Sequence, residues 1–178
     1  PFTERFEYDA QGREALHVSF EGVVTQSLYS PQTGRLSEQR FFPNVAAYDQ
    51  GLGAPRETWS FTYDAFGRER AVTQTPRDAN GTPLSVRTVT NTYDAQGRLT
   101  ATASPEGTVS YTYDHLGRRT ATIVGTVANP QRITSYTYDA LGRLKTVTED
   151  QDPLSTLDPQ LSTLYAYNLL GSLRRTPD

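Results

Sequence analysis

One short pattern, Tyr-Asp-x-x-Gly-Arg, occurs five times along this chain of 178 residues. A chain that repeats one short unit usually folds by stacking copies of it, so the repeat defines an architecture before it defines an active site. We call the four fixed residues the tetrad and predict that they form a structural repeat motif. The five copies consist of Tyr8, Asp9, Gly12 and Arg13; Tyr63, Asp64, Gly67 and Arg68; Tyr93, Asp94, Gly97 and Arg98; Tyr113, Asp114, Gly117 and Arg118; and Tyr138, Asp139, Gly142 and Arg143.

Degenerate copies of the tetrad lie between and after the intact ones. Segment 29–35 carries one inserted residue, and segment 167–172 has Asn in place of Asp and Ser in place of Arg. Two weaker traces are 78–81, which lacks the Tyr and the Arg, and 48–51, where the Gly comes one position early. Successive motif tyrosines are 20 to 34 residues apart. Steps this irregular argue against a β-propeller or a β-helix, which need a nearly fixed period.

The residues around the last intact tetrad, 135–148, predict a β-hairpin. Aromatic and β-branched residues alternate on both sides of a short break, which is the pattern of two paired strands. In the break, Asp139 occupies the first position of a type I turn, where its carboxylate accepts a backbone N–H from two residues on. Gly142 supplies the left-handed conformation that a G1 bulge requires. Turn chemistry therefore explains the Asp and the Gly of the tetrad.

The same turn predicts how side chains divide between the two faces of the hairpin. With the bulge at the glycine, one face carries Tyr136, Tyr138, Leu144 and Thr146, and the other carries Thr137, Arg143, Lys145 and Val147. Aromatic pairs two residues apart recur at 6/8, 61/63, 111/113 and 165/167. Side-by-side hairpins would join these pairs into a stripe, and we expect that stripe to be the packed core.

Second turns alternate with the tetrad turns, at 21–22, 105–107 and 125–130. The alternation predicts an all-β fold, a twisted antiparallel meander of sequential hairpins that runs through residues 1–178 as a single array. The two least regular segments, Phe41 to Arg56 and Glu149 to Gln160, are expected to be surface loops.

Composition narrows the possible partners. The chain has 20 acidic and 17 basic residues, a net charge of −3, which gives no basis for nucleic-acid or membrane-surface binding. Lys145 is the only lysine, and six of the 16 arginines directly follow a repeat glycine, so the arginine excess belongs to the motif. The sequence has no cysteine, no apolar run long enough to span a membrane and no signal peptide. Both ends fall within repeats, which predicts a section of a larger protein.

No residue pattern predicts catalysis, a cofactor or a metal site. The two histidines, His17 and His115, fall on an expected strand and in a tetrad turn, without metal-ligand spacing. Each turn offers one carboxylate, already used by the turn, whereas calcium loops cluster several oxygen ligands. The chain also lacks a nucleophile elbow, a phosphate loop and a dinucleotide fingerprint. We therefore predict a non-enzymatic chain with no cofactor.

The tetrad, followed by a Thr-rich strand and joined through Pro-x-Gly turns, resembles the YD repeat of the Rhs family. That family includes bacterial polymorphic toxins, insecticidal toxin complexes and the YD shells of teneurins. The resemblance covers nearly the whole chain and implies an arc of a spiralling β-sheet shell. In bacterial members the shell encloses a cytotoxic C-terminal segment. The core-terminal Asp-Pro-x-Gly motif of Rhs toxins is missing, since 152–154 and 158–160 lack its glycine, so the autoprotease activity is not expected.

The predicted function is thus a structural section of a Rhs-type shell from a secreted or cell-surface bacterial protein. Its expected partners are the remainder of the parent shell and the enclosed C-terminal segment. One alternative is a carbohydrate-binding or adhesion module, in which exposed tyrosines or Trp59 stack on sugar rings. Another is self-association through the unpaired strands at the two sheet edges.

Overall fold

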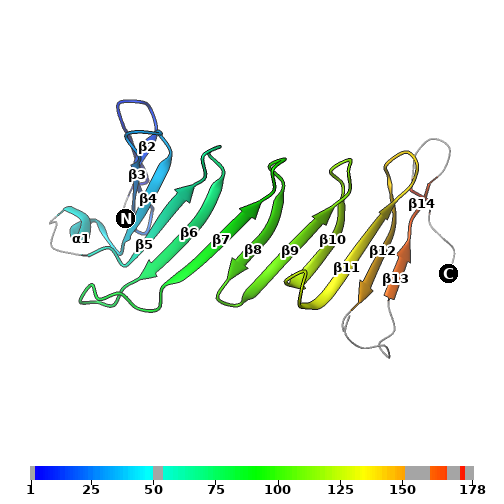
Figure 1. Ribbon diagram of the computed structural model, residues 1–178. Helices are drawn as coiled ribbons and strands as arrows, with labels where there is room; N and C mark the ends of the chain where they lie inside the picture. The colour runs from blue at the N-terminus through cyan, green and yellow to red at the C-terminus, as the bar shows by residue number, and fades with distance from the viewer. Residues whose placement is uncertain (1–2, 50–53, 151–160, 168–172, 175–178) are drawn as a thin grey trace. The chain divides into compact units, whose positions relative to one another are not determined.

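The computed structural model describes residues 3–49, 54–150, 161–167 and 173–174 (Figure 1). Thirteen strands follow one another in a sheet in sequence order, β1 to β13, and the order does not close on itself. The predicted fold class, an open antiparallel meander of sequential hairpins, is confirmed. The chain divides into two compact units, residues 1–90 and 91–178. We describe each unit by itself.

Unit 1 contains six strands and a short helix, and a seventh strand continues from it into unit 2. Tetrad turns, or the degenerate turn at 30–35, join β1 to β2, β3 to β4 and β5 to β6. The elements are β1 (Arg5–Tyr8), β2 (Glu14–Val18), β3 (Val24–Tyr29), β4 (Leu36–Phe42), α1 (Val45–Asp49), β5 (Glu57–Tyr63), β6 (Glu69–Pro76) and β7 (Arg87–Tyr93).

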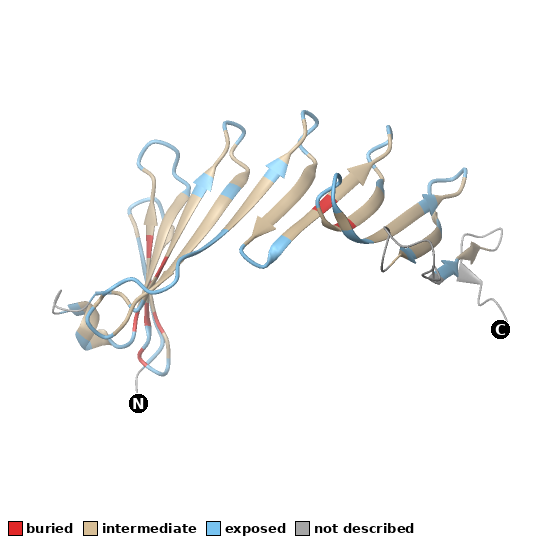
Figure 2. Ribbon diagram, turned by 60° about the horizontal axis from the view of Figure 1, so that its bottom comes forward, coloured by how far each residue is buried: buried red, intermediate tan, exposed pale blue. Residues whose placement is uncertain are grey.

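The buried core of unit 1 lies beneath the helix. Leu16, Val18, Val24 and Phe42 are buried. Two residues of α1, Val45 and Tyr48, pack against them. These are the buried segments on the N-terminal strands in Figure 2. The predicted aromatic core is therefore wrong. The motif tyrosines are half-buried, or exposed in the case of Tyr8, because a single-layer sheet without a second layer cannot enclose its face.

Unit 2 is a run of hairpins with little enclosed volume. Its strands are β8 (Leu99–Ser104), β9 (Gly107–Tyr113), β10 (Arg119–Gly125), β11 (Pro130–Tyr138), β12 (Leu144–Asp150), β13 (Leu161–Leu164), β14 (Ala166–Tyr167) and β15 (Leu173–Arg174). The last two form a separate two-stranded sheet. Within the described part of unit 2, Ile123 is the buried apolar side chain, and Ser110 is the buried polar one.

The register of the β11–β12 hairpin contains a second irregularity after the turn. Tyr138 lies opposite Leu144 as predicted, but Thr137 lies opposite Thr146 and Tyr136 opposite Val147. Lys145 is thus an extra residue on β12, and it reverses the predicted faces of Thr146 and Val147. The same shift follows the motif tyrosine in the β1–β2, β3–β4, β5–β6 and β9–β10 pairs.

The predicted loops have mixed outcomes. Segment 41–56 includes the end of β4 and helix α1. Tyr48 and Asp49 are therefore helical and do not form a degenerate tetrad turn. The turn at 78–82 has the expected hydrogen bonds, but it joins β6 to β7 and so lies at the opposite end of the strands from the tetrad turns. Most of segment 149–160 lies outside the described residues.

Candidate functional site

Each tetrad turn is organised around a single carboxylate. In the β9–β10 turn, Asp114 donates its N–H to the Arg118 carbonyl at 2.9 Å and accepts the Gly117 N–H at 3.0 Å on its own carbonyl. Its Oδ1 accepts the N–H groups of Leu116 and Arg118, both at 2.9 Å. The φ of Gly117 is +81°, as the predicted G1 bulge requires. The carboxylate therefore closes the turn with one oxygen, and its second oxygen is available for another donor.

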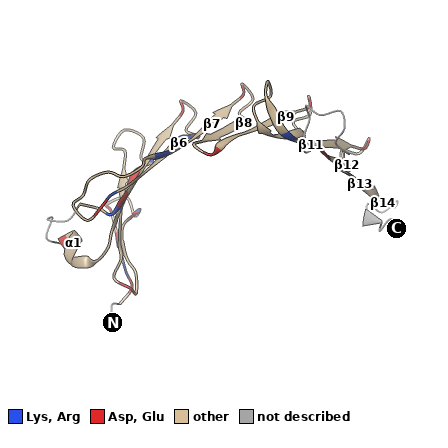
Figure 3. Cartoon of the chain, turned by 90° about the horizontal axis from the view of Figure 1, so that it is seen from below, with Lys and Arg blue, Asp and Glu red and all other residues tan. Residues whose placement is uncertain are grey.

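That second oxygen holds the tetrad arginine. Asp114 Oδ2 accepts the Arg118 Nε–H at 2.6 Å, and the other four intact tetrads repeat this pairing at 2.6–2.7 Å. Each of these five arginines therefore forms its ion pair with the aspartate of its own turn. In Figure 3, acidic residues mark the turns at the strand ends.

The ion pairs also affect ionisation. The hydrogen bonds from Arg13 lower the pKa of Asp9 below its ordinary value. For the other four aspartates, partial burial alone would raise the pKa, but the hydrogen bonds from the backbone and side chain of the paired arginine outweigh it and lower the pKa. All five carboxylates are therefore ionised at neutral pH and hold their arginines in fixed positions.

Four tetrad arginines, and Arg35 of the degenerate copy, each lie over the motif tyrosine of the next hairpin, whereas Arg68 lies 5.1 Å from the ring centroid of Phe66 in its own turn. The Arg118 guanidinium is 4.7 Å from the ring centroid of Tyr138, within the range of a cation–π interaction. The pattern recurs in both units. The pairs are Arg13 with Tyr29 at 4.2 Å, Arg35 with Tyr63 at 5.7 Å, Arg98 with Tyr113 at 4.8 Å and Arg143 with Tyr167 at 4.4 Å.

A hydrogen bond accompanies most of these ring contacts. The Tyr138 hydroxyl donates to the carbonyl of Arg119, the residue after the arginine that covers its ring, at 2.7 Å. Tyr29 donates to Glu14, Tyr63 to Leu36 and Tyr113 to Leu99 in the same way, at 2.7–2.9 Å. We call the ring contact and this hydrogen bond together the inter-hairpin contact. It joins one repeat to the next through side chains, in addition to the backbone ladder.

Tyr8 is the motif tyrosine that has no preceding hairpin in this chain, and it lacks the inter-hairpin contact. Its side chain is 63% exposed, and neither its ring nor its hydroxyl has a partner among the described residues. By contrast, burial raises the pKa of Tyr63, and the Glu69 carboxylate opposite it adds to the effect. Tyr63, Tyr113 and Tyr138, which each receive an arginine from the preceding repeat, are half-buried, whereas Tyr8 is exposed.

Sequence reasoning found the tetrad but missed this contact. Turn chemistry accounts for the Asp and the Gly, yet it gives no reason why Tyr and Arg should recur with them. That unexplained recurrence was the available signal. Two side chains that repeat together without a role inside their own unit indicate a role between units.

The two histidines and Trp59, which the sequence analysis considered as candidate site residues, lie in the sheet or in a turn. His17 stacks on Phe6 with ring centroids 4.5 Å apart, and its Nε2 lies 3.1 Å from Glu4 Oε1. His115 lies in a tetrad turn as predicted. Trp59 donates its indole N–H to Glu57 at 2.7 Å and meets Phe41 edge-on. Trp59 is therefore engaged within the sheet.

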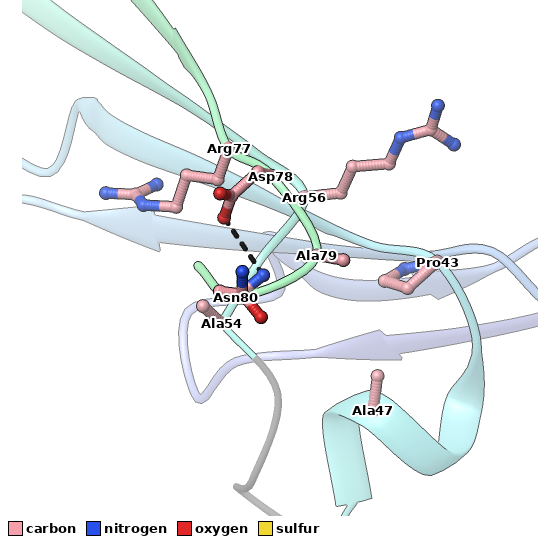
Figure 4. A pocket seen from close by; sticks show the side chains of 8 residues that line it. All are labelled: Pro43, Ala47, Ala54, Arg56, Arg77, Asp78, Ala79 and Asn80. Atoms are coloured by element: carbon pink, nitrogen blue, oxygen red, sulfur yellow. Dashed lines mark hydrogen bonds between the residues drawn. The ribbon is translucent and has the colours of Figure 1, made fainter. Parts of the chain in front are cut away.

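A cavity of about 580 Å³ lies in unit 1, between helix α1 and the β6–β7 connection (Figure 4). Two arginines border it, Arg56 and Arg77, and their guanidinium groups extend to opposite sides, away from its centre. Arg77 Nη1 donates to the buried Thr58 hydroxyl at 2.6 Å. With no convergent polar groups, the cavity has no arrangement that performs chemistry.

Metal binding and membrane crossing are the two remaining properties of the described ranges. No group of three or more His, Asp or Glu side chains there is positioned to hold a metal ion. No helix in those ranges has the length and apolar character needed to cross a membrane.

The RHS repeat family model matches residues 93–126. This segment holds two intact tetrads and the inter-hairpin contact between Arg98 and Tyr113. The predicted resemblance is confirmed over these residues: the chain contains an RHS repeat. No curated protein sequence is significantly similar to the chain.

Several solved structures align with most of the chain at low identity. They include a crystal structure of TcdB2-TccC3 (19% identity, TM-score 0.37), one of TcdB2-TccC3-Cdc42 (16%, 0.40) and a Photorhabdus luminescens Tc holotoxin pore (18%, 0.37). Each alignment covers 96% of this chain and 11% of the other chain. The chain therefore spans about a tenth of the length of these proteins.

Proposed function

We propose that the chain is a structural, non-catalytic section of a YD/Rhs-repeat β-shell that encapsulates or presents a C-terminal toxin or effector segment. The observation that carries this proposal is the inter-hairpin contact. The β9–β10 hairpin receives Arg98 on Tyr113 and offers Arg118 to Tyr138, so further copies of the same motif can extend the sheet by the same contact. Such a sheet can be extended repeat by repeat to form part of a shell.

The proposal also assigns partners and a cellular location to the chain. The array 1–178 acts as one section, and its partners are the remainder of the parent shell and the enclosed segment. The parent is an extracellular or cell-surface bacterial protein. The tetrad residues have a packing role, which accounts for their carboxylates and guanidiniums without assigning them to catalysis.

Protease protection in the parent protein tests this function. The full reading frame is expressed and treated with protease, and the survival of the segment C-terminal to the last repeat is followed by mass spectrometry. The proposal predicts that this segment survives far longer in the parent than when expressed alone. Equal digestion rates in the two forms would contradict encapsulation.

Carbohydrate binding is a second candidate, favoured by one observation. The motif tyrosines are half-exposed rather than buried, which leaves aromatic surface available for stacking on sugars. A glycan panel titrated while tyrosine and Trp59 fluorescence is followed should then give a saturable change. A flat response across the panel would remove this candidate.

A further inference from the structure

Arg119 is the one cation among the residues that follow the five tetrad arginines, since unit 1 has Glu14 and Glu69 at this position. The equivalent positions hold Leu99 and Leu144 in the neighbouring hairpins of unit 2. Arg119 lies opposite Tyr113, on the tyrosine face of β10, and its guanidinium lies 4.6 Å from the Tyr111 ring centroid. The hairpin geometry accepts leucine here, so the sheet itself does not require a cation.

The Arg119 guanidinium has no carboxylate partner among the described residues. The carboxylates of the two flanking turns, Asp114 and Asp139, are each held by their own arginine at 2.6–2.7 Å. Arg119 thus presents N–H donors to solvent, while the Tyr111 ring restricts its position. A pre-positioned guanidinium binds a carboxylate at lower entropic cost than a free side chain does.

A shallow pocket of about 310 Å³ adjoins this guanidinium. Arg119, Tyr136, Tyr138 and Leu144 line it, so its surface is aromatic and aliphatic apart from the one cation. The Tyr138 hydroxyl donates to the Arg119 carbonyl, and the Tyr136 hydroxyl lies 3.3 Å from the Thr122 hydroxyl. Both phenol groups are therefore engaged within the sheet and leave the guanidinium as the main free polar group.

We propose that this pocket binds a short acidic peptide segment in which a carboxylate lies next to a bulky apolar side chain. The carboxylate pairs with Arg119, and the apolar side chain covers Leu144 and the two tyrosine rings. A sugar fits less well, because its many hydroxyls would meet one free polar group. This inference does not depend on the proposed shell function.

The test uses the full chain and a fluorescein-labelled hexapeptide, Gly-Leu-Glu-Leu-Leu-Gly, followed by fluorescence anisotropy. The matched probe has Gln in place of Glu. We expect saturable binding of the Glu peptide at least tenfold tighter than that of the Gln peptide. Arg119→Leu should weaken binding at least tenfold while preserving the thermal midpoint, because leucine occupies the same position in adjacent hairpins.

Arg132→Leu is the matched control. Arg132 is an exposed arginine on the neighbouring strand β11 but does not line the pocket, so its loss should leave the affinity unchanged. The proposal is overturned if the Glu peptide fails to bind at millimolar concentration, or if Glu and Gln peptides bind equally. Equal losses for the two arginine variants would also overturn it, as would displacement of the peptide by a neutral oligosaccharide.

Discussion

The two units share the inter-hairpin contact but differ in how many apolar side chains they bury. Unit 1 encloses four buried apolar side chains beneath α1, whereas the described part of unit 2 encloses one, Ile123. In unit 2 the hairpins are joined by backbone ladders and by the contacts of Arg98, Arg118 and Arg143 with the next tyrosine. Unit 1 has the same contacts, from Arg13 and Arg35, so its helix-covered core is an addition to the links between repeats rather than a replacement for them.

The comparison indicates why the tetrad recurs although the core does not. A buried cluster needs a helix above the sheet, which a five-residue segment provides once in the described ranges. An inter-hairpin contact needs only the motif arginine of one hairpin and the motif tyrosine of the next, so it also forms at the degenerate copies that hold Tyr29, Arg35 and Tyr167. Repetition of the sequence thus supplies lateral connection rather than burial.

The largest effect is expected at the core of unit 1. Phe42→Ala should lower the free energy of unfolding by about 3–5 kcal/mol, because it leaves a cavity beside Val24 and α1. Urea unfolding measures the change. Phe66→Ala is the control, since its side chain is 82% exposed and its loss should cost less than about 0.5 kcal/mol. Similar losses for both would mean that unit 1 has no distinct core.

The next largest effect is expected at a tetrad turn of unit 2. Gly142 has a φ of +79°, and Gly142→Val should destabilise the fold by more than about 1 kcal/mol because β-branched residues resist positive φ. Gly142→Asn should cost less, since Asn tolerates this conformation. Thermal unfolding of the two variants distinguishes backbone strain from other causes. An unchanged midpoint for the Val variant would refute the turn assignment.

A smaller effect is expected for single hydroxyl groups. Tyr113→Phe should cost about 1 kcal/mol, because it removes the donor to the Leu99 carbonyl. Tyr8→Phe should cost nothing measurable, since its hydroxyl has no partner among the described residues. Chemical denaturation of both variants makes the comparison within one motif position. Equal losses would show that the hydroxyl acts in some way other than through the inter-hairpin contact.

The smallest effect per site is expected from acid. The folded pKa of each tetrad aspartate is lowered, so its contribution to stability is fully present above its ordinary pKa of about 4 and is lost as pH falls through the lowered value. The urea midpoint should therefore decline below about pH 4. Asp114→Asn should flatten part of that decline. A midpoint that stays constant down to pH 2.5 would contradict the role of the carboxylates.

Much of the fold follows from the sequence because turns are local. Asp139 and Gly142 determine their turn within four residues, and the strand order follows from alternating turns. The faces of Thr146 and Val147 were not predictable, because the extra residue Lys145 leaves no trace in the hydrophobic pattern. The core was missed for a related reason. Burial depends on a helix that folds over strands β2 to β4, which alternation along one strand cannot reveal.

The central claim is that the tetrad arginine stabilises the fold through the tyrosine of the next hairpin. A double-mutant cycle with Arg118→Met and Tyr138→Leu measures this coupling directly, and Arg98→Met with Tyr138→Leu is the mismatched control. We predict a coupling free energy of about 0.5–1 kcal/mol for the matched pair and none for the mismatched pair. Additive effects in the matched pair would contradict the claim.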